Sequence, residues 1–427
     1  MLRFKTTSVD GNHLSFGGFP FVQSLILSQG VDSLLDSVLP RAAKQAKYRA
    51  SDVVFSAFYS TLMGGDCLED VNFAHRELKN VRGFAPVSSD TLRSRLLSWS
   101  EDTQNLYSGD FNRIQNRVNN AVVLNDALQR VAALSLPPQR GGYRLDVDAH
   151  LMEHDKPDAA YSYQKRGGYA PLCSFVGSLP VQVEMRGGNT SPGYGIKDHV
   201  LKTIAELKEK GVDIREVCSD AAGYQLELLK RLDRKGIRFY IRAKKSPAME
   251  KHMGSLTGWT DFGNKNTEQQ WTESTWNGYR LIVQRQPKPD GQTSIFSAAA
   301  YIYRAIITND SRIKSDGAFI IRHYNKRGGI ERNFDVLRND FGWAKMPFSN
   351  MADNTSYLLL MALCLNLFEW VKTQVHGKTN LIKSTAIRVK AFVFRFAAVP
   401  AKWIQSGRQT LLKIFSTREY SALLVPS

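Results

Sequence analysis

Three carboxylates lie where the predicted secondary structure would expose them at or beside the end of a sheet. Asp148 closes a predicted strand, Asp220 follows another and precedes small residues, and Glu331 begins a predicted helix. Each alone is typical of a solvated group or a turn cap. Together they could bind hard divalent cations such as Mg²⁺ or Mn²⁺, because clustered carboxylates repel one another without cations. Two such ions would support in-line phosphoryl transfer.

Neighbouring groups compete with this assignment. Asp146 lies two residues before Asp148, and side chains two apart on a strand share a face, so Asp146 is an alternative ligand. His150 and His154 are four residues apart, but no third nitrogen or sulfur ligand lies nearby in the sequence. We therefore favour ordinary polar histidines over a zinc site.

The elements that must position the carboxylates form an α/β pattern. Three strand-like runs occur within 143–186, and helix, strand, helix and strand then alternate over 196–242. Hairpins can join the first three strands, whereas the later strands need helical crossovers. If the first and fourth strands are neighbours, Asp148 and Asp220 lie close together.

Segments of different character flank this sheet. Residues 1–136 have apolar residues at helical spacing, which predicts a helical domain for DNA binding or for packing and dimerisation. Aromatic and β-branched runs over 257–309 predict a β-rich insertion within a catalytic domain of 143–372. The basic segment 373–427 is predicted to be mainly helical, either lying along DNA or forming a solvated surface.

The composition favours a polyanionic partner. Lys and Arg number 57 against 40 Asp and Glu, which leaves a formal net charge of +17. Nucleic acid suits this excess because binding to phosphates releases counterions, although a merely basic soluble protein has the same composition. Lys244 and Lys245 directly follow a predicted strand and are candidates for phosphate contacts, with a solvated loop as the alternative.

Cysteine spacing and hydropathy indicate in which cellular compartment the protein is expected. The four cysteines lie far apart, which argues against a disulfide framework and favours a reducing cytoplasm. The longest apolar run, 357–367, is too short to span a bilayer. We therefore expect a cytoplasmic protein without a membrane anchor.

The most specific motif is Tyr324-x2-Arg327-x3-Glu331-x6-Arg338. It resembles the Tyr-x2-Arg-x3-Glu-x6-Lys signature of bacterial insertion-sequence transposases of the DDE type. Arg338 stands where that signature has Lys, which keeps the positive charge but changes the geometry available for gripping phosphate.

Further segments are similar to the same group, most closely to the insertion sequence 1380 family. Residues 145–150 are similar to the strand of the first aspartate, although His150 departs from the usual Ser or Thr. Residues 215–224 are similar to the segment of the second aspartate, and 185–189 resemble an Arg-x-Gly-Asn turn. The matches keep their order over 143–403.

The resemblance implies an RNase H-like catalytic domain that holds two Mg²⁺ ions, with Mn²⁺ as a possible substitute, at Asp148, Asp220 and Glu331. It implies a transposase that binds the terminal inverted repeats of its element and cleaves and joins DNA. Its partners would be double-stranded transposon ends and target DNA, bound by a homodimer in the bacterial cytoplasm.

The resemblance also implies that Tyr324, Arg327 and Arg338 line the DNA backbone. Core packing is an equal alternative for Tyr324. Two other functions stay open: a DNA-binding protein that has lost catalysis, and a metal-dependent nuclease without strand transfer.

Overall fold

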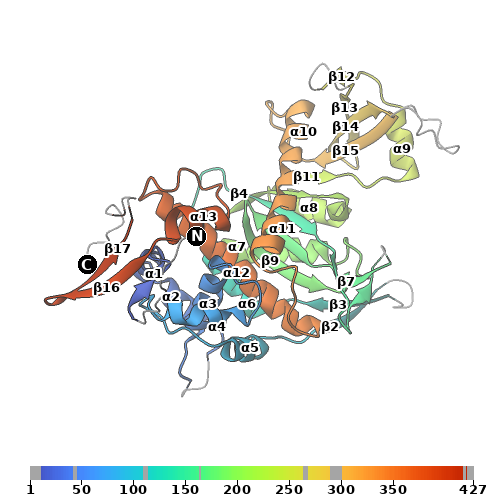
Figure 1. Cartoon of the computed structure of the whole chain (residues 1–427). Helices are drawn as coiled ribbons and strands as arrows, with labels where there is room; N and C mark the ends of the chain where they lie inside the picture. The colour runs from blue at the N-terminus through green and yellow to red at the C-terminus, as the bar shows by residue number, and fades with distance from the viewer. Residues whose placement is uncertain are drawn as a thin grey trace, which may run out of the picture. The chain divides into compact units, whose positions relative to one another are not determined.

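The computed structural model describes residues 11–41, 46–108, 114–162, 165–262, 268–288, 301–416 and 420. They form a mixed α/β structure with a large mixed sheet (Figure 1). The chain splits into two compact units. We call them the helical unit, made of Met1–Thr103, Asn119–Ser135 and Asp335–Ser427, and the sheet unit, made of Gln104–Val118 and Leu136–Phe334.

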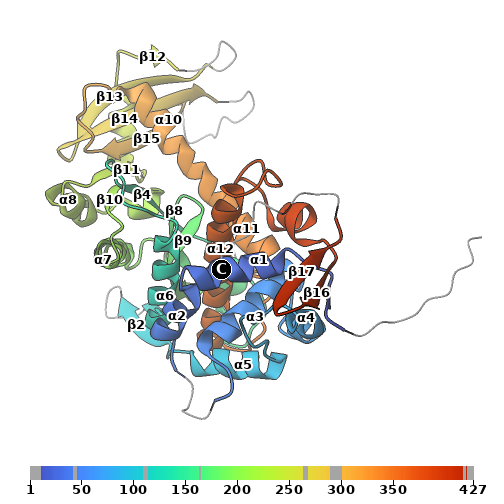
Figure 2. The same cartoon turned by 90° about the vertical axis from the view of Figure 1, so that its left-hand side faces the viewer.

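The main sheet has the strand order β12-β13-β14-β15-β11-β10-β4-β8-β9-β3-β2 (Figures 1 and 2). Its central strand β4 pairs antiparallel with β8 and parallel with β10, which in turn pairs parallel with β11. The first and fourth strands predicted from the sequence correspond to β4 and β10. They are neighbours in the sheet, which is the condition for Asp148 and Asp220 to lie close together. The bounds of these strands are β2 (Gln104–Ser108), β3 (Ile114–Asn119), β4 (Tyr143–Ala149), β8 (Leu172–Val176), β9 (Leu179–Arg186), β10 (Ile214–Ser219), β11 (Arg238–Arg242), β12 (Thr260–Asp261), β13 (Gln270–Trp276), β14 (Tyr279–Pro287) and β15 (Tyr301–Thr308).

Local sequence explains the connections between the central strands. β8 and β9 form an antiparallel hairpin whose turn contains Gly177 in the left-handed region, at φ 62°. The parallel strands are reached through α7 (Ile196–Glu209) and α8 (Leu226–Arg234). α7 packs against β8, β9 and β10, and α8 packs against β11. A small separate sheet joins β5 (Met152–Glu153), β7 (Gly167–Tyr169) and β6 (Ala160–Tyr161).

The predicted β-rich segment continues the main sheet. β15 pairs antiparallel with β11, and β13 and β14 follow in the same sheet. Helix α9 (Pro247–Gly254) precedes these strands, and α10 (Gly317–Asn325) packs across β13, β14 and β15. At Gly317 an added Cβ would lie 2.2 Å from the ring of Trp271, so the close approach of helix and strand needs glycine there. Residues 263–267 and 289–300 of the predicted segment lie outside the described residues.

The helical unit packs around one long apolar helix. α12 (Met351–His376) contacts α1, α3, α5 and α6. By length and composition α12 could cross a membrane, but 83% of its most apolar window is buried, as expected for a core helix. The remaining elements of this unit are α1 (Phe19–Ser28), α2 (Val31–Val38), α3 (Ala50–Leu62), α4 (Asp70–Leu78), α5 (Ser89–Ser98), α6 (Val122–Ala133), α13 (Val389–Phe392), a π-helical turn (Val393–Ala397), β1 (His13–Leu14), β16 (Ala401–Ser406) and β17 (Gln409–Ile414).

One of the two predictions about the flanking segments was wrong. Helices make up most of the regular structure described in 1–136, as predicted, although strands β2 and β3 also lie there and extend the main sheet. The described part of 373–427 contains a short helix, a π turn and a β hairpin instead of mainly helix. In the hairpin, side chains of the two strands alternate between faces around a turn at Gly407, with φ 58°. The net charge of the segment obscured this period-two pattern.

Candidate active site

The sheet register places Asp148 and Asp220 side by side. Ser219 on β10 pairs with Val147 on the parallel strand β4. The next residue of each strand is an aspartate, so both carboxylates lie at the carboxyl ends of neighbouring strands. Asp220 then caps a 3₁₀ turn, where its Oδ1 accepts a hydrogen bond of 2.9 Å from the Ala222 amide.

The electrostatics of Asp148 reflect this crowding. Burial raises its pKa to about 6, and the neighbouring negative charge of Asp220 acts in the same direction. The positive charge of Arg327 opposes both effects. Nη2 of Arg327 lies 2.9 Å from Oδ1 of Asp148, and both side chains are largely shielded from solvent. The site therefore carries two close carboxylates and one guanidinium.

Arg327 and Glu331 come from consecutive helical turns. α10, a 3₁₀ turn (Lys326–Gly328) and α11 (Gly329–Asp340) follow one another directly (Figure 2). An α-helix has about 3.6 residues per turn, so intervals of three, four and seven residues keep side chains near one face. The spacing of Tyr324, Arg327, Glu331 and Arg338 follows these intervals.

Glu331 is less closely engaged than the aspartates. Its side chain is exposed, one helical turn beyond Arg327. Within the described parts of the chain, Glu331 does not join Asp148 and Asp220 in a group whose ligand atoms all lie within 4.8 Å. The structure thus brings two of the three predicted ligands together and places the third on the adjoining helix. Arg338 is also exposed on α11.

Asp146 has a different environment from Asp148. Nε and Nη2 of Arg144 lie 2.8 and 2.5 Å from Oδ1 of Asp146. Nη1 of the same guanidinium donates to the carbonyl oxygen of His323. Burial raises the pKa of Asp146, and Arg144 opposes that shift. This ion pair ties Asp146 to the strand and helix, whereas Asp148 lies at the end of the strand.

The aromatic and histidine side chains near the site mainly have packing contacts. Tyr324 is only 5% exposed within a hydrophobic cluster, and the guanidinium of Arg242 lies 5.3 Å from its ring centroid. His150 stacks on Phe334 with ring centroids 4.6 Å apart. His154 packs edge-on against a tyrosine ring, and burial lowers its pKa. In this structure the packing alternative for Tyr324 is the observed one.

A hollow lies close to Asp220 in the sequence. It has a volume of about 390 Å³ and is lined by Ala221, the residue after Asp220, by Lys244 and Lys245, and by further cationic and apolar side chains. Both lysines are exposed. Two further cations line this hollow, Arg242 and Arg304, and neither was predicted from the sequence. Arg242 ends β11 and so could have been inferred from its place beside the two lysines.

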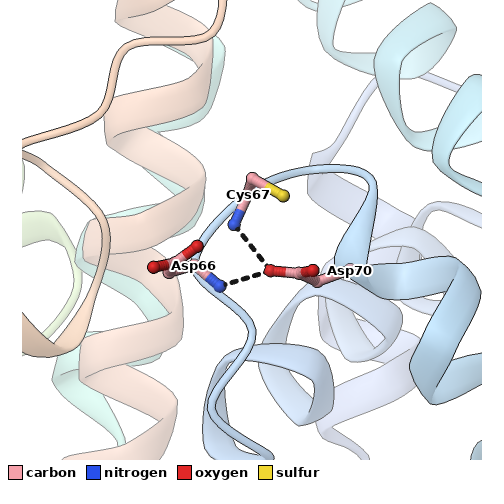
Figure 3. A group of neighbouring side chains, drawn as sticks. All are labelled: Asp66, Cys67 and Asp70. Atoms are coloured by element: carbon pink, nitrogen blue, oxygen red, sulfur yellow. Dashed lines mark hydrogen bonds between the residues drawn. The ribbon is translucent and has the colours of Figure 1, made fainter.

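A second acidic group lies in the helical unit. Asp66, Cys67 and Asp70 have ligand atoms within 4.8 Å of one another (Figure 3). Figure 3 shows that Asp70 accepts hydrogen bonds from the backbone amides of Asp66 and Cys67 at the start of α4. Lys345 forms an ion pair with Asp66. These contacts account for the cluster as a helix-start turn, and it is not our candidate catalytic site.

The family model described as Transposase DDE domain group 1 matches residues 6–425. The chain belongs to this DDE transposase family. Members of the family use divalent metal ions, and Asp148 and Asp220 are carboxylates that could bind such an ion. No curated protein matches.

Among solved structures, the chain is similar to a piggyBac transposase synaptic complex with hairpin DNA, determined by cryo-electron microscopy. The identity is 11%, the match covers 89% of this chain and 78% of the other, and the TM-score is 0.44.

The paired aspartates of this DDE transposase fit a divalent cation. Carboxylate oxygens are the ligands that Mg²⁺ and Mn²⁺ prefer. Repulsion between Asp148 and Asp220 contributes to the raised pKa of Asp148, and a bound cation would relieve that repulsion. Arg327 already supplies one positive charge at Asp148. The donor set therefore suits a hard cation.

Proposed function

We propose that this protein cleaves and joins DNA strands at an RNase H-like site formed by Asp148, Asp220 and Glu331. The observation that carries the proposal is the pair of aspartates at the ends of parallel strands, with the pKa of Asp148 raised to about 6. Two Mg²⁺ ions, or Mn²⁺ in their place, would activate the attacking oxygen and stabilise the leaving oxygen. The family assignment supports this chemistry.

The residues of the chain have distinct roles in this proposal. Asp148 and Asp220 hold the cations from neighbouring strands, and Glu331 completes the ligand set from the exposed first turn of α11. Arg327 offsets the negative charge of Asp148 and can hydrogen-bond to the DNA backbone.

The remaining basic groups bind DNA phosphates without taking part in the chemistry. Lys244 and Lys245 contact the strand beside the hollow next to Asp220, and Arg338 contacts the backbone further along α11. Tyr324 is buried, so we assign it to positioning Arg242 rather than to direct contact.

The proposed biological context is that of a bacterial insertion sequence, most like the insertion sequence 1380 family. The protein would act in the cytoplasm as a homodimer on DNA and would bind the terminal inverted repeats and a target duplex. The net charge of +17 supports a polyanionic partner.

A cleavage assay on DNA flanking the gene, with and without Mg²⁺, tests this function. We expect Asp148→Asn, Asp220→Asn and Glu331→Gln each to lower cleavage more than about 100-fold, beyond the effect usual for outer-shell residues. Binding to the same DNA should persist, because the basic surface is unchanged. Asp146→Asn is the matched control and should keep cleavage within about tenfold of the wild type.

Product analysis separates transposition from simple hydrolysis. A transposase joins a 3′-hydroxyl end to new DNA, whereas a nuclease only releases fragments. Full cleavage by any of the three carboxylate variants would remove that residue from the site. Cleavage without joined products would favour a metal-dependent nuclease.

A further inference from the structure

The β16–β17 hairpin has a firmly anchored base. β1 pairs with β16, so His13 lies opposite Lys402 and Leu14 lies opposite Ala401. Nε1 of Trp403 donates a hydrogen bond of 2.8 Å to the Asn80 carbonyl. The guanidinium of Arg82 lies 4.4 Å from the Trp403 ring centroid. These contacts fix the direction of the hairpin relative to the rest of its unit.

Beyond this base the hairpin is exposed. Figure 1 draws β16 and β17 as a ribbon that extends past the helices of the helical unit. Residues 405–411 are exposed from one strand through the turn to the other, with Leu411 exposed to 42%. Each strand has six residues, or roughly 20 Å at about 3.3 Å per residue. The tip is therefore a projecting two-stranded ribbon without packing partners on the described chain.

One face of the hairpin carries a row of basic side chains. His13, Lys402 and Lys413 are consecutive cross-strand partners on β1, β16 and β17. Like charges directly opposite one another destabilise a sheet. In the described part of the chain, no carboxylate forms a salt bridge with Lys402, Lys413 or the tip residue Arg408. An anion placed across the row would remove this repulsion.

The sequence around the hairpin is also rich in basic residues. Residues 377–416 contain eight Lys or Arg and no Asp or Glu. The tip adds Arg408 and Gln409, whose side chains can hydrogen-bond to base edges, while the amide of Gln405 is hydrogen-bonded within the hairpin to Gly407 and Thr410. A polyanion with polar edges between its phosphates therefore matches the hairpin better than a neutral or apolar partner.

We propose that this hairpin enters the major groove of duplex DNA, with its tip toward the bases and the row of His13, Lys402 and Lys413 toward the phosphates. The major groove is about 12 Å wide and admits a two-stranded ribbon, whose strands lie about 4.8 Å apart. This inference rests on the proposed function for its choice of DNA as partner. It places an element that contacts DNA bases in the helical unit, outside the sheet unit.

The competing occupant is a second copy of the chain. β17 is the edge strand of its sheet and could pair with another edge strand. Lys413 on that edge disfavours such pairing, because charged residues protect exposed edges. DNA is the occupant that the charge favours.

Photocross-linking tests which partner occupies the hairpin. The full-length protein with benzoylphenylalanine at Leu411 would be irradiated with duplex DNA that flanks its gene. We expect a covalent protein–DNA product. A cross-linked protein dimer instead would identify the second copy as the occupant and overturn the proposal. The lack of any cross-link would also overturn it.

Salt-dependent binding provides an independent measurement. The variant Lys402→Gln, Arg408→Gln, Lys413→Gln should make the negative slope of log affinity against log salt shallower, by about 0.9 for each lost phosphate contact. The matched control Lys208→Gln, Lys230→Gln, Lys235→Gln removes the same charge from exposed positions on or beside α7 and α8. It should keep a slope closer to that of the wild type. Equal slopes for the two variants would refute a specific role of the hairpin.

Both measurements are separable from catalysis. Because Arg408, Leu411 and Lys413 are exposed and Lys402 is only partly buried, the melting temperature should stay within about 2 °C of the wild type, as for ordinary surface changes. A protein that cross-links through the hairpin but does not cleave DNA would refute only the proposed catalytic function. A protein that cleaves DNA with no hairpin contact would refute only this inference.

Discussion

At the scale of single residues, the central feature is the pair Asp148 and Asp220 with Arg327 beside it. The register of two parallel strands brings the carboxylates together. Arg327, in the 3₁₀ turn between α10 and α11, places its guanidinium beside Asp148. Arg327 was expected to contact DNA. Its ion pair with Asp148 shows that the same group also balances charge inside the site.

The raised pKa of Asp148 has a measurable consequence for stability. The folded protein holds this proton up to about pH 6, whereas an unfolded aspartate releases it near pH 3.9. Asp148 therefore makes folding less favourable as pH rises from about 4 to 6, by on the order of 2–3 kcal/mol above that window. Asparagine does not titrate.

We therefore expect the difference in unfolding free energy, Asp148→Asn minus wild type, to increase across pH 4 to 6 and then level off. Denaturant unfolding in EDTA at several pH values measures it. Asp146→Asn is a useful comparison. It removes the ion pair of Asp146 with Arg144, just as Asp148→Asn removes the ion pair of Asp148 with Arg327. A difference for Asp148→Asn that does not change with pH would contradict the assigned protonation.

At the scale of elements, α10 and α11 determine which groups face the site. The backbone at Gly329 is helical, with φ −61° and ψ −22°, and no atom lies within 4 Å of an added Cβ. Gly329→Ala should therefore stabilise the protein by about 0.5–1 kcal/mol without moving Glu331. Insertion of one alanine after Gly328 should instead rotate Glu331 by about 100°.

Thermal unfolding and cleavage assays check this pair of variants together. We expect Gly329→Ala to retain cleavage with a higher melting temperature, and the insertion to lose cleavage while it still binds DNA. If the insertion variant cleaves normally, the helix face does not position Glu331, and another carboxylate must supply the third ligand.

At the scale of the whole molecule, the helical unit combines segments that are far apart in the sequence. It is made of Met1–Thr103, Asn119–Ser135 and Asp335–Ser427, and the apolar helix α12 is a core element. The hairpin, with its basic row, belongs to this same unit. Our two proposals therefore assign DNA recognition to the helical unit and the chemistry to the sheet unit.

We expect the protein to dimerise on DNA, because strand transfer must bring two element ends together. Analytical ultracentrifugation of the full chain should show a species of twice the mass on a duplex that carries one end, and a smaller species without DNA. The Asp148→Asn variant serves as the control, since assembly requires no cleavage. A monomer on DNA at all concentrations would contradict the proposed homodimer.

The sequence by itself determined the features that depend on local pattern. The alternation before Asp148 predicted a strand, and the residues from Ile330 predicted a helix, and the structure contains both. These inferences succeeded because periodicity and turn chemistry act over a few residues.

Only the tertiary structure decided the rest. It showed that Arg327 pairs with Asp148, that Tyr324 is buried, and that Glu331 lies apart from the two aspartates. It also placed β2 and β3 in the main sheet and folded residues 401–414 as a hairpin. Pairing between distant strands depends on burial and register across the whole chain, which local composition does not encode.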